Sequence, residues 1–443
     1  MEITKMILVF IGFIMFFLLL NKLEKSETLN SELIRKILHI GSGFGGLALP
    51  FIFEKKSSVM ILGVIFLAVL ISIRLIKNRI SGFRKVLETK NRKTFGDIYF
   101  IISILGLWIV SSEDKIMYSL PLIILMFSDA FAALIGEFYS KYKFDTGFGT
   151  KSVEGSVTFF LTTYFICINF FLFFSNIKSI NIVLVSLLLS ILAMILEMIS
   201  WNGLDNIFVP LFVYLFLKLN LYLTARELMY KLWVIIVLFA IIILNRKKTT
   251  LTRVAQTASL FFLYIVMIIG GIKWLIPPLL MYLGYYHFTP KVKGQVKDSL
   301  KGLLAIAFTT AMWLAMSIIL DKNKMYLIYI FAFSLHFGII NLIRDNAGNI
   351  KRETFRMNFL MGSIGKAFAF FIINYLALSK MLDFKILIGI IIFIFGGIFI
   401  YETSMKIFYI IEKEKELSGE TKVFIASGIV FACSILLLGL GML

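Results

Sequence analysis

The stretch Ile180–Ile199 reads INIVLVSLLLSILAMILEMI, an almost unbroken apolar run of twenty residues. Its single charged side chain is Glu197, three positions from the end. A helix of about 20 apolar residues is long enough to cross the hydrocarbon core of a bilayer. Because lipid offers no hydrogen-bond partners, the backbone N–H and C=O groups of such a run must form their hydrogen bonds within the helix. The stretch therefore predicts a transmembrane helix with a carboxylate close to one membrane surface.

Similar apolar runs recur from one end of the chain to the other. The chain has 443 residues, 60% of them hydrophobic, with a mean hydropathy of +0.93, whereas a soluble domain is about 45–50% apolar. We count about fifteen or sixteen runs of spanning character. The sequence predicts an all-α, polytopic integral membrane bundle with about that number of transmembrane helices.

Charge and cysteine content exclude two classes of function. The formal net charge is +19, which we assign to loops held beside anionic lipid and not to nucleic-acid binding. The two cysteines, Cys167 and Cys433, each fall inside a predicted span. A disulfide framework or a cysteine-ligated zinc site is therefore not expected.

The distribution of basic residues predicts the topology. Residues 74–93 hold eight lysines and arginines, so we place this loop in the cytoplasm. Counting spans outward puts the polar residues of the first half of the chain on that same side. One loop disagrees, because residues 218–231 fall outside in this scheme yet carry Lys218, Arg226 and Lys231.

The chain also divides by the kind of residue it carries. Residues 1–225 hold the polar motifs described below, whereas residues 231–443 are mostly spans and basic loops. We expect two membrane domains, with the chemistry in the first and an additional multi-span domain of unknown role in the second.

Asp129 lies within an apolar span, where a carboxylate is costly and commonly functional. With Ala132, Ala133 and Gly136 it follows the i, i+3, i+4, i+7 spacing of one helix face. A small face with a carboxylate at its rim suits Mg²⁺, which proteins bind through one or two carboxylates plus substrate phosphates. The alternative is a small-residue packing face on which Asp129 pairs with a lysine.

The hexapeptide Lys151-Ser152-Val153-Glu154-Gly155-Ser156 opens the predicted span Val153–Phe174. Unpaired N–H groups and the helix dipole favour an anion at such a position. Lys151 and Ser152 could bind a phosphate, Gly155 allows close approach, and Glu154 could bind the metal. The alternative is ordinary capping, with Ser152 as N-cap and Glu154 against the helix dipole.

Two further clusters are predicted at the same membrane face. Glu197 ends one span and is followed by Gly203, Asp205, Asn206 and Pro210 at the start of the next. These carboxylates could complete a metal site or act as a base, or they could belong to a polar turn between spans.

The second cluster is Arg35-Lys36-x-x-His39-x-Gly41. On a helix Lys36, His39 and Gly43 share a face, and a cationic cluster there suits a phosphate. The alternative is a positive-inside anchor, and the same alternative applies to Arg92, which precedes Gly96.

In order and spacing these motifs resemble the integral-membrane, CTP-dependent lipid kinases. This family includes dolichol kinase, phytol kinase and a related diacylglycerol kinase, and it is related to the phosphatidate cytidylyltransferases. The resemblance covers roughly residues 31–222 and rests on Arg35-Lys36-x-x-His39-x-Gly41, Arg92-x-x-x-Gly96, Asp129-x-x-Ala132-x-x-x-Gly136, Lys151-Ser152-x-Glu154-Gly155-Ser156, and Glu197 followed by Gly203-x-Asp205-Asn206-x-x-x-Pro210. Two positions depart from the family pattern: Ser128 and Ser140 stand where glycine is frequent.

The resemblance implies transfer of the γ-phosphate of CTP to the hydroxyl of a lipid alcohol, either a prenol such as phytol or a polyprenol, or diacylglycerol. We expect Mg²⁺ as cofactor, the cytoplasmic membrane of a bacterium as location, and an active site on the cytoplasmic side. Partners would be CTP, the lipid alcohol and the bilayer, with no nucleic acid.

Site residues are predicted in three groups. The catalytic group is Asp129, Lys151, Glu154, Glu197 and Asp205, in which Glu197 or Asp205 takes the alcohol proton. The metal ligands are Asp129, Glu154 and Asp205. The nucleotide- and phosphate-binding group is Arg35, Lys36, His39, Arg92, Gly136, Ser152, Gly155, Ser156 and Asn206.

Two other functions remain open from the sequence. A cytidylyltransferase that makes a CDP-lipid shares the Asp and Lys-x-x-Glu-Gly segments, but its Pro-Gly-His-Gly-Gly element is absent here. A polytopic lipid transporter would also suit the number of spans, yet it predicts polar residues near the bilayer midplane, whereas this cluster falls at one rim.

Overall fold

The computed structural model describes most of the chain. It covers residues 1–26, 29–75, 95–111, 114–146, 149–247, 249–287, 299–320, 322–347, 353–378, 383–411 and 417–440. Arg92 and most of the basic stretch 74–93 lie outside the described residues.

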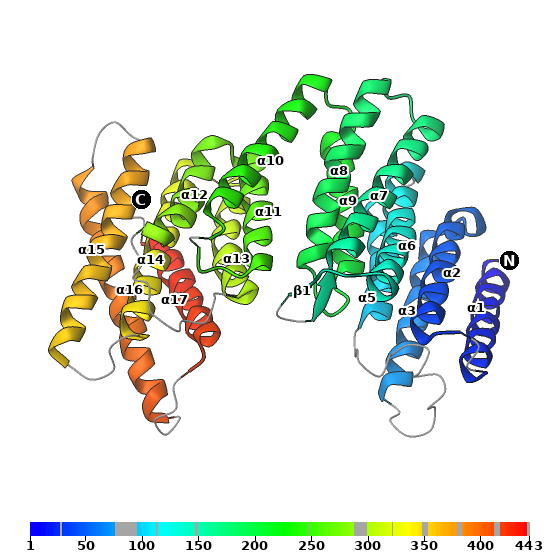
Figure 1. Cartoon of the computed structure of the whole chain (residues 1–443), viewed down its shortest axis with the longest axis horizontal. Coiled ribbons are helices and arrows are strands. Elements are labelled where there is room, and N and C mark those ends of the chain that lie inside the picture. The colour runs from blue at the N-terminus through cyan, green and yellow to red at the C-terminus, as the bar shows by residue number, and fades with distance from the viewer. Residues whose placement is uncertain are drawn as a thin grey trace. The chain divides into compact units, whose positions relative to one another are not determined.

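The predicted all-α class is confirmed. Sixteen helices occur in the described part of the chain, and eleven of them are long and apolar enough to cross a membrane by length and composition. The fold is that of a polytopic membrane protein (Figure 1).

The chain divides into two compact units, Met1–Trp233 and Val234–Leu443. The first contains α1 (Glu2–Lys25), α2 (Ser31–Ile52), α3 (Lys56–Leu75), α5 (Gly96–Val110), α6 (Lys115–Phe138), β1 (Lys143–Asp145), β2 (Thr150–Ser152), α7 (Val153–Phe174), α8 (Ser179–Ile199) and α9 (Asp205–Asn220). The division falls within α10 (Ala225–Asn245). The second contains α11 (Arg253–Gly270), α12 (Ile272–His287), α13 (Leu300–Met316), α14 (Lys322–Ala347), α15 (Glu353–Leu378), α16 (Phe384–Ile411) and α17 (Gly419–Gly439).

Helix α6 is the core of the first unit. It packs against α2, α7 and α9, while α8 packs on α7 and α9, and α5 packs on α3 and α9. Leu120, Leu122, Ile124 and Leu125 are fully buried along it. Helix α1 lies at the periphery and contacts only α2 and α3 to a substantial extent within the described residues.

Polar residues fix where several of these helices begin. The Asp114 carboxylate accepts from the backbone N–H groups of Ile116 and Met117, and the Asn30 side chain accepts from Glu32 N–H. Each bond satisfies a donor that the first turn of a helix leaves unpaired.

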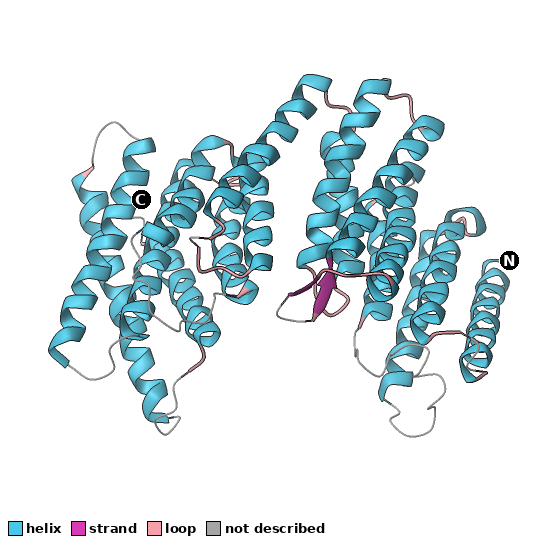
Figure 2. Ribbon diagram, in the orientation of Figure 1, coloured by secondary structure: helices cyan, strands magenta, loops and turns pink. Residues whose placement is uncertain are grey.

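A short β-hairpin interrupts the helices between α6 and α7. Strands β1 and β2 are antiparallel, with Phe144 opposite Lys151 (Figure 2). No strand was predicted for these residues, because strands of three residues are too short to show a hydrophobic alternation. The hairpin holds Lys151 directly before the start of α7.

The loop that disagreed with the predicted topology is shorter than the sequence suggested. Lys218 lies in α9, and Arg226 and Lys231 lie in α10, so the connection is only residues 221–224. Lys231 donates to the Asn220 side chain at 2.6 Å. At least one of the three basic residues therefore has a partner within the protein.

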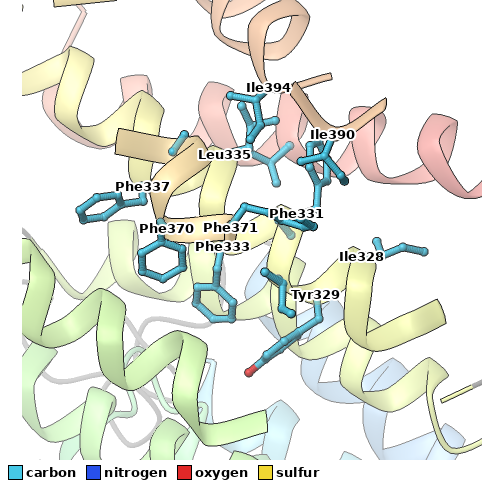
Figure 3. Packing of buried hydrophobic residues seen from close by; sticks show 14 of the residues in the cluster. Ile328, Tyr329, Phe331, Phe333, Leu335, Phe337, Phe370, Phe371, Ile390 and Ile394 are labelled. Carbon is cyan, nitrogen blue, oxygen red and sulfur yellow. The ribbon is translucent and has the colours of Figure 1, made fainter. Parts of the chain in front are cut away.

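Helix α14 is the core of the second unit. It packs against α12, α13, α15, α16 and α17, and almost every residue of its apolar segment is buried. Figure 3 shows Phe331, Phe333 and Leu335 among neighbours from α15 and α16. A helix that is apolar on all sides is expected at the centre of a bundle.

Candidate active site

The predicted site residues of the described chain gather at one end of the first unit. They come from the first turns of α2, the C-terminal half of α6, strand β2 with the start of α7, the end of α8, and the start of α9. The contacts described below join these segments, and Figure 2 shows the hairpin at the same end of the helices. These residues therefore lie at one end of the first unit, and the predicted membrane face of that end stays a prediction.

A buried ion pair lies at the centre of this cluster. The Lys36 ammonium lies 2.5 Å from Asp129 Oδ2, across 93 residues of sequence. The Lys36 side chain is 3% exposed and that of Asp129 is 16% exposed. A buried pair has little net value for stability because desolvation offsets the attraction. Its retention inside a membrane bundle is better explained by function.

His39 lies beside this pair. Its Nε2 is 3.5 Å from Asp129 Oδ2 and 3.2 Å from the Leu125 carbonyl oxygen, and its ring lies against Phe100 with centroids 4.6 Å apart. Lys36 and His39 thus both approach Oδ2. Within the described residues, both of these contacts go to Oδ2 and neither goes to Oδ1.

The predicted shared face of Lys36, His39 and Gly43 is confirmed. All three contact α6: Lys36 through Asp129, His39 through Leu125, and Gly43 through Met126. A Cβ on Gly43 would lie 2.8 Å from the Met126 side chain, so the glycine allows α2 and α6 to approach. This approach brings the Lys36 ammonium within reach of Asp129.

The small face of α6 packs against α7. A Cβ on Gly155 would lie 2.9 Å from the Ala132 carbonyl oxygen and 3.5 Å from Gly136 Cα. Next to Asp129 itself, the Thr163 hydroxyl donates to Ser128 Oγ at 2.9 Å. The alternative interpretation of this face was a small-residue packing surface on which Asp129 pairs with a lysine. Both features are present: α6 and α7 are in close contact, and Lys36 pairs with Asp129. The roles of Asp129 and these glycines toward a nucleotide stay predictions.

A second ion pair joins the hairpin to the end of α8. The Lys151 ammonium lies 2.6 Å from Glu197 Oε1 and also donates to the Glu197 carbonyl oxygen. The two side chains are 20% and 12% exposed. The pair fixes the Lys151 side chain over the rim where α6, α7 and α8 meet.

The other polar residues of the hexapeptide serve the local structure. Ser152 caps α7 by accepting from Gly155 N–H at 3.1 Å, and the Ser156 hydroxyl donates to the Ser152 carbonyl oxygen. The Glu154 carboxylate accepts from the backbone N–H groups of Lys141 and Tyr142 at 2.9 and 3.2 Å. Glu154 therefore anchors the chain that enters the hairpin.

The start of α9 is fastened to the start of α5. Asn206 Nδ2 donates to the Gly96 carbonyl oxygen at 3.1 Å, and the Ser103 hydroxyl donates to the Asn206 carbonyl oxygen. Gly203 adopts a φ of +86°, and a Cβ there would lie 2.7 Å from Gly96 Cα. Glycine is required at Gly203 both for this conformation and for the contact.

Asp205 completes the charged rim. It is close enough to interact electrostatically with Arg35 and with Glu197, and Asp129 interacts with the same two residues. Arg35 also holds Glu32 through a 2.5 Å ion pair. Three cations, Arg35, Lys36 and Lys151, thus alternate with carboxylates over one small area.

The structure does not bring the three predicted metal ligands together. Among the described residues, no group of three or more histidine, cysteine, aspartate or glutamate side chains is close enough to hold one ion. Since Mg²⁺ needs only one or two carboxylates when phosphates supply further oxygens, Asp129, whose side chain is 16% exposed, fits such an ion. Glu154 is engaged by the backbone, and its role as a ligand stays a prediction.

An apolar cavity borders the charged rim. It has a volume of about 320 Å³ and lies between α1, α2, α3 and α5. Phenylalanine, leucine and glycine residues form most of its wall, and polar side chains border it from α2, α5 and the start of α9: Arg35, His39, Ser42, Asp97 and Asn206. His39 borders the cavity and also contacts Asp129.

Two residues of this region were missed from the sequence. Asp97 at the start of α5 forms a 2.5 Å ion pair with Arg74 at the end of α3, and it borders the cavity. Phe100, one turn further along α5, packs on the His39 ring. The acidic residue in the first turn of an apolar helix was a usable signal for Asp97, whereas nothing in the sequence distinguishes Phe100 from the other phenylalanines.

Comparison with known proteins gives one informative similarity. The chain is 26% identical over 201 residues to a phytol kinase from Synechocystis sp. (strain ATCC 27184 / PCC 6803 / Kazusa), a match that covers 44% of this chain and 80% of that protein. No family model and no solved structure matches the chain. The similarity supports a membrane kinase that acts on a lipid or prenol, at the level of the family.

Proposed function

We propose that this protein is a membrane lipid kinase that transfers the γ-phosphate of CTP to the hydroxyl of a lipid alcohol at the cytoplasmic face. The observation that carries the proposal is the position of His39, which touches Asp129 on one side and an apolar cavity on the other. A charged rim suited to phosphates therefore adjoins a space suited to a hydrocarbon chain. A lipid kinase needs this adjacency.

The cations of the rim are assigned to the triphosphate. Phosphoryl transfer depends on positioning and on positive charge around the phosphates. Lys36, Lys151 and Arg35 each pair with a carboxylate. Phosphate oxygens make stronger charge-assisted contacts than neutral acceptors. The phosphate oxygens of the bound nucleotide contact these three cations. The neighbouring carboxylates keep the lysine and arginine side chains oriented.

Asp129 is assigned to Mg²⁺, which its carboxylate would hold together with phosphate oxygens. When bound, the ion would neutralise the negative charge that develops on the β- and γ-phosphate oxygens. The Lys36 contact to Oδ2 fixes the rotamer of the carboxylate.

In the reaction, the alcohol oxygen forms a bond to the γ-phosphorus while the bond from that phosphorus to the β,γ-bridging oxygen breaks. CDP leaves, and the hydroxyl proton passes to a carboxylate. We assign this role to Asp205, because its neighbour Asn206 borders the cavity, whereas Glu197 is held by Lys151. General-base assistance of this kind contributes about 10²–10⁴-fold to a rate.

A positional label tests the proposal. The full chain, purified in detergent with Mg²⁺, is given CTP labelled at either the α- or the γ-phosphate, together with a mixture of prenols and diacylglycerol. Label that enters lipid from the γ-position alone is the expected result. Entry from the α-position would make the protein a CDP-lipid synthase, and absence of lipid label from either position would overturn the proposal. The same assay with ATP determines which nucleotide is preferred.

A further inference from the structure

We infer that the cavity between α1, α2, α3 and α5 holds the single hydrocarbon chain of a linear lipid alcohol, with the hydroxyl at His39. This inference rests on the proposed kinase function and deepens it, because it names the acceptor class and its location. A two-chain acceptor such as diacylglycerol is thereby excluded as the preferred substrate.

The chemistry of the wall suits a hydrocarbon. Along most of its length the cavity is lined by aromatic and aliphatic side chains such as Phe13, Phe66 and Leu105. Binding sites for small molecules combine such walls with a few convergent polar groups. Here the polar groups come from the N-terminal half of α2 and from the first turns of α5 and α9, so the polarity of the cavity matches that of an alcohol with one long tail.

The orientation follows from His39. Its ring is packed against Phe100 on the cavity side, while its Nε2 faces Asp129 at 3.5 Å. A hydroxyl at this end lies next to the carboxylate assigned to the metal and phosphates. A chain in the opposite orientation would place its hydroxyl among apolar side chains, where an unpaired hydroxyl is costly.

The size of the cavity points to one chain. A volume of about 320 Å³ is near the lower end of the range of ligand pockets, about 300–1,000 Å³. The width is set by close packing at Gly41, Gly46 and Gly63, where an added Cβ would lie 2.4–2.9 Å from Phe16, Ile104 or Leu105. A cavity of this volume suits one hydrocarbon chain.

Helix α1 provides the route from the bilayer. It lines the cavity with Val9, Gly12 and Phe13, and its other face carries exposed Leu8, Ile11 and Met15. The helix thus separates the cavity from lipid by a single layer. A membrane-dissolved alcohol enters beside α1 without crossing water.

Two glycines make the inference testable. Gly12 and Gly45 both line the cavity, and an added Cβ at either meets no other atom within 4 Å. Gly45→Leu is therefore expected to fill space in the cavity, because its Cβ meets no neighbour. Gly428→Leu in α17 is the matched control, because Gly428 also has open space around its Cβ position and lies in the second unit. Leucine is a better helix former than glycine, so both variants are expected to fold.

Kinetics on alcohols of different length provide the first measurement. For Gly45→Leu we expect KM for phytol to rise about tenfold or more, since the lost burial of two methylene groups is enough for that change. Turnover of the much shorter geraniol is retained, and Gly428→Leu behaves as wild type. An equal effect on both alcohols, or an unchanged KM for phytol, overturns the inference while leaving the kinase assignment intact.

Crosslinking provides a measurement that needs no turnover. A photoreactive phytol analogue, with the reactive group near the end of the tail, is expected to label peptides from α1, α2, α3 or α5, and Gly45→Leu is expected to reduce that labelling. Labelling confined to other helices overturns the inference even in a preparation without kinase activity. If the cavity is labelled but no alcohol is phosphorylated, the proposed function fails and the binding site stands.

Discussion

The Lys151 ammonium lies 2.6 Å from Glu197 Oε1 and joins two segments that are 46 residues apart. One partner comes from a three-residue strand and the other from the last turn of a membrane helix. Because the Asp129 and Asp205 carboxylates also act on Glu197, the pair links the hairpin to the whole charged rim. Removing either side chain therefore tests both the stability and the chemistry of the site.

Replacing Lys151 by Met should abolish a phosphate contact and leave the Glu197 charge without its partner. We expect label transfer from γ-labelled CTP to fall about 100-fold or more, in the range seen when one charge-stabilising group is removed. We also expect a loss of about 3 kcal/mol of stability, the lower end for a broken buried pair, because both side chains keep some exposure. Thermal unfolding in detergent and the label assay measure the two effects.

The double variant Lys151→Met with Glu197→Gln separates these effects. It has no uncompensated charge, so most of the lost stability should return while activity stays low. Recovery of activity together with stability would show that Lys151 acts only through the fold.

Asp129→Asn preserves the size of the side chain and removes its charge. We expect phosphoryl transfer to fall by at least about 100-fold, because the carboxylate would no longer hold a metal or balance Lys36. Protein yield and monodispersity in detergent serve as the control for folding. A variant that folds and retains activity contradicts the assigned role.

The partner change Lys36→Met tests the same site from α2. On its own it leaves Asp129 as a buried, unpaired carboxylate and should destabilise the protein by about 3–5 kcal/mol. Combined with Asp129→Asn it should be less harmful to stability than either change alone. An additive loss in the double variant would mean that the two side chains do not interact as the 2.5 Å contact indicates.

Gly203→Ala tests the junction of α5 and α9. The new Cβ would face the Gly96 backbone at 2.7 Å, in a conformation with φ +86° that alanine disfavours. We expect a loss of about 1–3 kcal/mol, with reduced activity because Asp205 and Asn206 follow directly. Gly428→Ala, which meets no neighbour, should be neutral or slightly stabilising, and an equal effect of both changes would contradict the predicted strain.

The sequence predicted best those features that depend on neighbouring residues, such as helical periodicity and helix caps. The span Val153–Phe174 was predicted with the bounds that α7 has, because Ser152 caps its first turn and the residues beyond that turn are mostly apolar. The shared face of Lys36 and His39 was likewise predictable from helical spacing. The contacts Lys36–Asp129 and Lys151–Glu197 were not, because each joins segments that only the packing of the bundle brings together.

Some residue types suit both a catalytic and a structural role, and this limited the prediction of the site. Glu154 lies three residues after Lys151 and directly before Gly155, a pattern that suits a metal ligand. Its carboxylate instead accepts hydrogen bonds from the backbone N–H groups of Lys141 and Tyr142. No sequence pattern reveals that a hairpin of two three-residue strands places those N–H groups within its reach. The cavity was also not predictable, because most of its wall comes from four helices and its glycines are spread between Gly12 and Gly96.

Removal of divalent cations tests the assignment of Asp129 without changing the chain. With EDTA in excess, label transfer should fall to background, and added Mg²⁺ should restore it, since the phosphate charges then lack their main neutralising partner. The described carboxylates supply too few ligands for a preformed ion cage, so the apparent affinity for Mg²⁺ should rise with the CTP concentration. Thermal stability in the absence of nucleotide should not change with EDTA. A loss of stability on chelation would instead indicate a resident structural ion, and full activity in EDTA would remove the metal from the mechanism.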